Sequence, residues 1–167
     1  MELEFKPVVA GDIDRLRPFY GLRPNKTCDS VFLDSFLWKD YYHVQCAVSE
    51  GRAVLWLMEK DGQVSTAMPL CREEDLPYFF QQMVDYFSGV LHKPFYISLA
   101  DEEAVQCLNL DPALFEVEEQ VDLKDYLYSG EELRKLEGKK FVKKRNHLNG
   151  FKRTYEGRYE YRRLCCS

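Results

Sequence analysis

Residues 43–70 read HVQCAVSEGRAVLWLMEKDGQVSTAMPL and contain three apolar runs separated by two short turns. The second turn contains Asp61 and Gly62, a pair that favours the positive φ angles of a tight hairpin turn. The runs therefore predict an antiparallel meander of three strands. The middle run, residues 53–58, is apolar at every position, which is typical of a central strand covered on both faces. Helices must supply that cover.

Helical periodicity flanks the meander on both sides. Apolar residues recur at intervals of three and four in four segments, at 11–22, 28–42, 73–91 and 101–109. Asp29 or Ser30 is suited to cap the second of these helices and Asp101 the fourth, because a short polar side chain accepts a free backbone N–H there. Strands are expected at 2–6 and 94–100, and an extended segment at 114–128.

This element order predicts a protein that mixes helices and strands (α/β in the broad sense), and more narrowly one of the α+β class. The order resembles the GNAT acyltransferase fold, which is a mixed, largely antiparallel twisted sheet with helices on both faces. A usual GNAT enzyme binds a pyrophosphate at a glycine-rich turn before a helix. The corresponding turn here, PLCREEDLPYF at 69–79, lacks glycine and carries three carboxylates. We therefore expect no acetyl-CoA bound in the usual way, and no other cofactor.

A basic stretch stands out in a chain whose net charge is −5. Residues 138–153, GKKFVKKRNHLNGFKR, carry seven Lys or Arg and no carboxylate. Ser129 and Glu132 form a capping box that starts the helical region carrying this stretch. A charge run is most often a solvated helix face, but here no carboxylate within the stretch offsets the repulsion. Lys144 also falls within the apolar stripe of the helix, where a buried ammonium needs an anion. A phosphate partner would answer both points.

The sequence contains no clear motif for catalysis, metal binding or membrane insertion. The 167 residues suffice for one domain with a core, and no segment has the apolar length of a membrane span. The six cysteines form no CxxC pair, and no GxSxG, HExxH or P-loop motif is present, so we expect no metal site and assign no catalytic residue. The expected location is cytoplasmic, with peripheral contact at the inner membrane surface.

Two stretches resemble a known family. Residues 130–155, GEELRKLEGKKFVKKRNHLNGFKRTY, are similar to the GKK…KKRNHxNxFK signature of the bacterial family grouped with the C-terminal domain of phosphatidylglycerol lysyltransferases. Residues 30–42, SVFLDSFLWKDYY, resemble the FLW helix in the N-terminal half of that family.

The resemblance implies two GNAT folds in tandem and, in relatives, transfer of an aminoacyl group from aminoacyl-tRNA to a lipid or peptide. Basic side chains would hold the phosphate of tRNA or of an anionic phospholipid. The positions that carry over as phosphate-binding residues are Lys139, Lys140, Lys143, Lys144, Arg145, Asn146, His147 and Asn149.

The same resemblance suggests how the chain is divided. Residues 1–128 would form the N-terminal GNAT-like domain and 129–155 a basic connecting helix region, while 156–167 would begin a second domain. We expect the second GNAT-like domain to be the main partner and to hold the catalytic half, so that this chain alone is inactive. Two alternatives stay open, namely an interaction module that docks its basic helix on an acidic protein and an RNA-binding adaptor.

Overall fold

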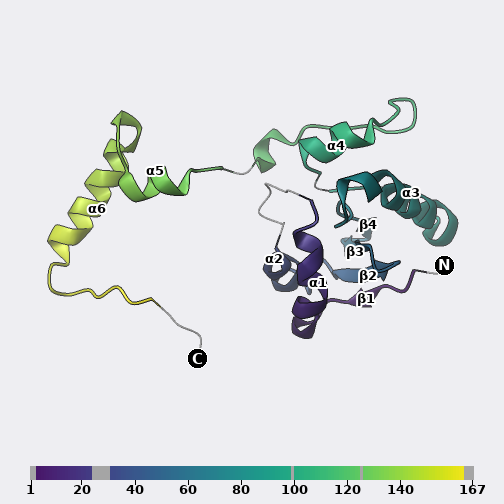
Figure 1. Cartoon of the computed structure of the whole chain (residues 1–167), viewed down its shortest axis with the longest axis horizontal. Coiled ribbons are helices and arrows are strands. Elements are labelled where there is room, and N and C mark those ends of the chain that lie inside the picture. The colour runs from purple at the N-terminus through teal and green to yellow at the C-terminus, as the bar shows by residue number, and fades with distance from the viewer. Residues whose placement is uncertain (1–2, 24–30, 99, 125, 164–167) are drawn as a thin grey trace. The chain divides into compact units, whose positions relative to one another are not determined.

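The computed structural model describes residues 3–23, 31–98, 100–124 and 126–163 (Figure 1). The chain forms two compact units, residues 1–123 and 124–167. The first unit contains a β-sheet with helices, and the second contains two helices. The predicted division at residue 128 stays a prediction.

The sheet of the first unit has the strand order β1-β2-β3-β4, and each pair of neighbours is antiparallel. The strands are β1 (Lys6–Pro7), β2 (Gln45–Ser49), β3 (Ala53–Lys60) and β4 (Gln63–Ser65). Asp61 and Gly62 have φ angles of 51° and 81°. The predicted meander and its turn are therefore confirmed, and so is the α+β class.

The two faces of β3 are buried against different helices (Figure 1). Ala53 and Leu55 pack in a cluster with α3 (Leu76–Tyr86) and α4 (Glu102–Leu108). Val54 and Trp56 pack in a second cluster with α1 (Ile13–Tyr20) and α2 (Phe32–Leu37). Because side chains alternate between the faces of a strand, an uninterrupted apolar strand needs cover on both sides. The prediction for residues 53–58 is confirmed.

A helix forms in each predicted segment, but α2 is much shorter than the helix expected at 28–42, because residues 38–43 form turns. α1 follows a 3-10 turn at Ala10–Asp12, and α3 is preceded by a similar turn and continued by a π-helical turn at Phe87–Leu91. α2 begins after Val31, while Asp29 and Ser30 lie outside the described residues. Asp101 caps α4 as predicted, because its carboxylate accepts the backbone N–H of Ala104 at 2.8 Å.

The strand predicted at 94–100 is wrong for the residues described there. One parallel bridge joins Thr66 to Ile97, and the N–H of Thr66 donates to the carbonyl of Tyr96 at 2.9 Å. Phe95 explains the apolar run, because its ring packs 5.3 Å from those of Phe80 and Phe87. The apolar residues of this segment therefore reflect packing in the core and not backbone pairing between strands. Segment 114–128 likewise forms no strand among its described residues.

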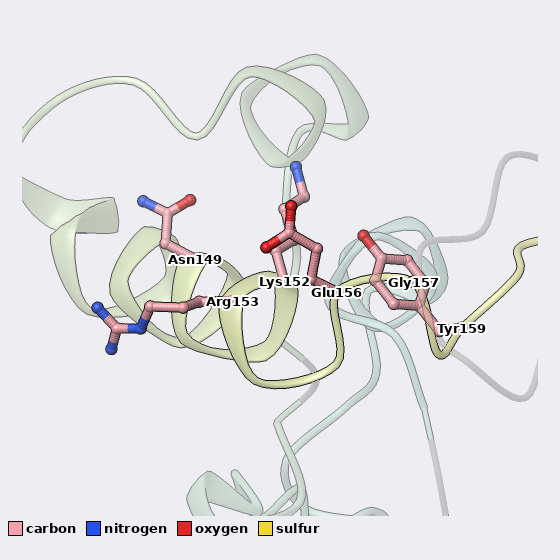
Figure 2. Close-up of a pocket in the computed structure, with 6 residues that line it drawn as sticks. All are labelled: Asn149, Lys152, Arg153, Glu156, Gly157 and Tyr159. Carbon is pink, nitrogen blue, oxygen red and sulfur yellow. The ribbon is translucent and has the colours of Figure 1, made fainter.

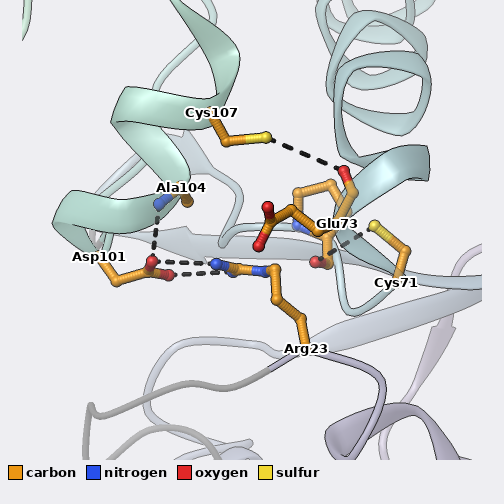
Figure 3. A network of polar contacts seen from close by, with 7 residues as sticks. Arg23, Cys71, Glu73, Asp101, Ala104 and Cys107 are labelled. Carbon is orange, nitrogen blue, oxygen red and sulfur yellow. Dashed lines mark hydrogen bonds and ion pairs between the residues drawn. The ribbon is translucent and has the colours of Figure 1, made fainter.

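An ion pair joins the chain beyond α1 to the start of α4 (Figure 3). Both nitrogens of the Arg23 fork donate to the Asp101 carboxylate at 2.9 Å, and the two side chains are 6% and 7% exposed. Burial acts to raise the pKa of Asp101, but the hydrogen bonds from Arg23 and Ala104 outweigh it and hold that pKa below its usual value. The pair is therefore structural and fully charged at neutral pH.

The second unit is a helix pair closed by an arginine. α5 (Gly130–Lys135) begins at Ser129, whose hydroxyl accepts the N–H of Glu132 at 3.4 Å, and α6 spans Val142–Thr154 after a 3-10 turn at Lys139–Phe141. Between the helices, Leu136 and Gly138 have positive φ angles. Arg145 of α6 donates to the carbonyls of both residues, at 2.9 Å for Gly138. The guanidinium thereby satisfies the carbonyl of Leu136, the C-cap of α5, and ties it to Gly138 at the start of the 3-10 turn.

We predict that Asp101→Ala lowers the unfolding free energy of the first unit by about 3 kcal/mol, because it removes one partner of a buried pair and the α4 cap. Both tryptophans, Trp38 and Trp56, belong to this unit, so urea unfolding followed by their fluorescence reports on it. The control is Glu4→Gln in the exposed Glu4–Lys6 pair, which should cost less than about 0.5 kcal/mol.

The difference in unfolding free energy between the parent and Asp101→Ala should depend on pH and become smaller in acid. Because the pKa of Asp101 is lower in the folded chain, the stabilisation is complete above the unfolded value near 3.8 and is lost as pH falls through the folded value. The gap between the parent and Asp101→Ala should therefore be constant near neutral pH and shrink in acid. A gap that is small at neutral pH or grows in acid would contradict the assignment.

We also predict that Arg145→Gln loosens the turn between α5 and α6. Loss of two charge-assisted hydrogen bonds to carbonyls should speed amide exchange of residues 130–138 by about tenfold. Lys143→Gln makes the same charge change in the same turn of α6 and should leave those rates unchanged. Equal rates in the two variants would show that Arg145 does not hold the turn.

Candidate functional site

The eight residues predicted to bind phosphate all lie on α6 and the 3-10 turn before it. Seven have exposed side chains, and Arg145 is half-buried. The helix predicted for this stretch is confirmed, so the basic residues do form a structured surface. Their individual environments differ, however, and these differences decide which of them are available to a ligand.

Four lysines gather at the N-terminal end of α6, where the helix dipole already contributes positive potential. Lys139 and Lys140 lie in the 3-10 turn, and Lys143 and Lys144 lie in the first turn of the helix. That turn contains no acidic residue, and neither helical element has a side-chain cap. The four lysines also form like-charged pairs at i,i+4 spacing, which are mutually repulsive. This end of α6 is therefore strongly electropositive.

Two of these lysines have partners that the sequence did not indicate. Lys140 forms an ion pair with Glu132 of α5 at 2.7 Å, so a carboxylate from outside the stretch offsets part of its charge. Lys144 is exposed, with its Nζ 5.5 Å from the ring centroid of Tyr128. The expectation that Lys144 is buried and needs an anion is wrong, because the stripe at its position faces solvent and an aromatic ring.

Lys139 and Lys143 are different. Within the part of the chain that the structure describes, neither ammonium group has a hydrogen bond, an ion pair or a ring contact. Both side chains are exposed, with Lys139 in the 3-10 turn and Lys143 in the first turn of α6. They are the two cations at this end of α6 that are free to meet an incoming anion.

Arg145 is engaged elsewhere. Its guanidinium donates to the carbonyls of Leu136 and Gly138 and so stabilises the turn between the helices. We therefore regard it as a positioning residue for the lysines at the start of α6. The nearby Phe141 is 4% exposed and anchors the same turn, whereas Leu148 and Phe151, farther along the stripe, stay exposed.

Asn149 belongs to a second feature, an open hollow at the C-terminal end of α6 (Figure 2). Its lining residues are Asn149, Lys152, Arg153, Glu156, Gly157 and Tyr159. The helix dipole is negative at this end, and the Glu156 carboxylate offsets one of the two cations that line the hollow. The hollow therefore suits an anion less well than the start of the helix does. Asn149 also lies about 9 Å along the helix axis from Lys143. The structure does not bring all eight residues together.

Asn146 and His147 are exposed on α6 between these two ends.

Two aromatic residues near Lys144 were missed by the sequence reasoning. Tyr126 and Tyr128 have nearly parallel rings, with 6.5 Å between their centroids and 21° between their planes. Their i,i+2 spacing in an extended segment was a signal that could have suggested a shared face.

The first unit offers less for chemistry. Arg23 and Asp101 neutralise each other, and burial raises the pKa of the neighbouring Cys71 thiol to about 11. Cys71 and Cys107 donate to the carbonyls of Pro69 and Glu73 (Figure 3). The Cys71 thiol is therefore protonated at neutral pH and is not a ready nucleophile.

Three further findings bear on the site. Among the described residues, no group of three or more His, Cys, Asp or Glu side chains is placed to hold a metal ion. No described helix is both long and apolar enough to cross a bilayer. The turn before α3 contains Glu73, Glu74 and Asp75, and the absence of usual acetyl-CoA binding there stays a prediction.

Comparisons with known proteins show what the whole chain is similar to. A conserved protein of unknown function from Bacteroides thetaiotaomicron VPI-5482 has a similar solved structure, with a TM-score of 0.79 and 25% sequence identity. The match covers 92% of this chain and 51% of that one, so the chain spans about half the length of this relative. No curated protein matches the sequence. The family described as "Phosphatidylglycerol lysyltransferase, C-terminal" matches residues 21–167. The chain belongs to this phosphatidylglycerol lysyltransferase C-terminal family.

Proposed function

We propose that the second unit binds phosphate groups at the N-terminal end of α6, and that Lys139 and Lys143 make the principal contacts. The single observation that carries this proposal is the accumulation of four lysines at a helix end that the dipole already makes positive. Such an arrangement is unfavourable in isolation, and an anion relieves it. Lys140 and Lys144 would add charge at the rim of the site.

The phosphate would belong to a substrate of aminoacyl transfer. Membership of the family supports a role related to lysyl transfer, in which tRNA and an anionic phospholipid both carry phosphate. In this proposal the unit holds a substrate and Arg145 fixes the turn that presents the lysines. No residue of this chain is assigned to bond making, and the chain alone would not catalyse transfer.

The rest of the activity would come from a second GNAT-like domain, the proposed partner of this one. The α+β sheet with helices on both faces agrees with a GNAT-like first domain, and the solved relative is about twice as long as the matched region. The location proposed for the complete protein is the cytoplasmic side of the inner membrane, where both phosphate-bearing substrates are accessible.

Binding to phosphate-rich ligands should depend on the start of α6 and on salt. We predict that Lys139→Gln with Lys143→Gln weakens binding to a folded RNA and reduces the slope of log K against log salt by about 1 to 2, because each phosphate contact releases counterions. Fluorescence anisotropy at several salt concentrations measures this. Anionic vesicles in a parallel series distinguish lipid phosphate from RNA phosphate.

The matched control is Lys152→Gln with Arg153→Gln, which removes the same charge from the other end of α6. This control should keep the parent slope. Arg145 is left unchanged in both variants, since its loss would disturb the turn. If the two double variants weakened binding equally, or if the parent bound neither RNA nor anionic vesicles, the site proposed at the start of α6 would be wrong.

A further inference from the structure

We infer that Tyr126 and Tyr128 form a stacking platform for unpaired nucleotides, so that the phosphate ligand of the second unit is a single-stranded segment of nucleic acid. This inference rests on the proposed function and specifies its substrate. It assigns a role to two residues outside the basic stretch.

The exposure of the two rings is the first observation. Tyr126 is 87% exposed and Tyr128 is 49% exposed, although a tyrosine ring that is not packed loses the benefit of burial. The intervening Leu127 is 82% exposed as well, and it contributes no aromatic ring. The two tyrosines therefore present flat surfaces on one side of the chain.

The relative orientation of the rings is the second observation. The planes are 21° apart and the centroids are separated by 6.5 Å. Two aromatic rings that enclose a third ring must be about 7 Å apart, which is twice the optimal carbon–carbon separation. A small opening of the pair would thus admit one base between the rings, and a base can also stack on an outer face. Stacking of this kind tolerates any base sequence.

The position of Lys144 is the third observation. Its ammonium lies 5.5 Å from the centroid of the Tyr128 ring, in the first turn of α6. A nucleotide stacked on Tyr128 would therefore have a cation within reach of its phosphate, and Lys143 continues the positive surface. Aromatic faces beside a basic groove are the usual means of holding single strands. A lipid headgroup offers phosphate but no planar ring, so it would make no use of the parallel arrangement.

The test uses the full chain and an unstructured RNA oligonucleotide of about ten nucleotides, compared with an RNA duplex of the same length. The parent should bind the single strand more tightly. Tyr126→Ala with Tyr128→Ala should lower affinity for the single strand by about tenfold or more, and should leave the salt slope unchanged, because stacking releases no phosphate counterions. Tyr126→Phe with Tyr128→Phe keeps both rings and should retain parent affinity.

Leu127→Ala is the matched control, since it removes an exposed apolar side chain that lies between the two tyrosines in the sequence. If Leu127→Ala weakened binding as much as the tyrosine variant, the segment would be a general apolar contact and the inference would fail. Equal binding of the parent to single strand and duplex, or a parallel loss of binding to anionic vesicles in the tyrosine variant, would also overturn it. If salt-dependent phosphate binding were unchanged in the tyrosine variant, only this inference would be refuted. If the parent bound no phosphate at all, the proposed function would be refuted too.

Discussion

The two-sided burial of β3 is the constraint on which the first unit depends. An apolar strand in the middle of a four-stranded sheet must be covered on both faces, so the chain has to provide helices before and after the meander. α1 and α2 supply one layer and α3 and α4 supply the other. The Arg23–Asp101 pair then joins the segment after α1 to the start of α4. Because buried charge is tolerated only when it is paired, this contact also makes the layers interdependent.

A different constraint organises the second unit. Its helices are short, few of its side chains are buried, and the turn between α5 and α6 depends on Phe141 and on the guanidinium of Arg145. Of the basic residues in residues 138–153, one is thus engaged in structure and another is paired with Glu132. What remains at the start of α6 is a small group of lysines with no carboxylate in their helical turn. The functional proposal concerns this remainder and not the whole basic stretch.

The sequence predicted most of what hydrophobic periodicity governs. The meander, its turn at Asp61 and Gly62, the four flanking helices, the Asp101 cap and the basic helix could all be derived from local patterns. The strand expected at 94–100 could not be judged correctly, because Phe95 is apolar for the sake of an aromatic cluster, and an apolar run reads alike in both cases. For the candidate site, several environments of the basic residues differ from those expected. A helical projection placed Lys144 in a buried stripe, whereas α6 leaves most of that stripe open to solvent. The contacts of Arg145 and Lys140 run to α5 and its turn, so no analysis of α6 alone would find them.

An anion site at the N-terminal end of α6 can be tested by titrating the full chain with inorganic phosphate and following the backbone amide NMR shifts. We expect saturable shifts that are largest at residues 139–144 and weak around Asn149 and Tyr159. Shifts that centre on the hollow at the end of α6, or that spread evenly over all lysine-bearing segments without saturation, would show that the anion site is not at the start of α6.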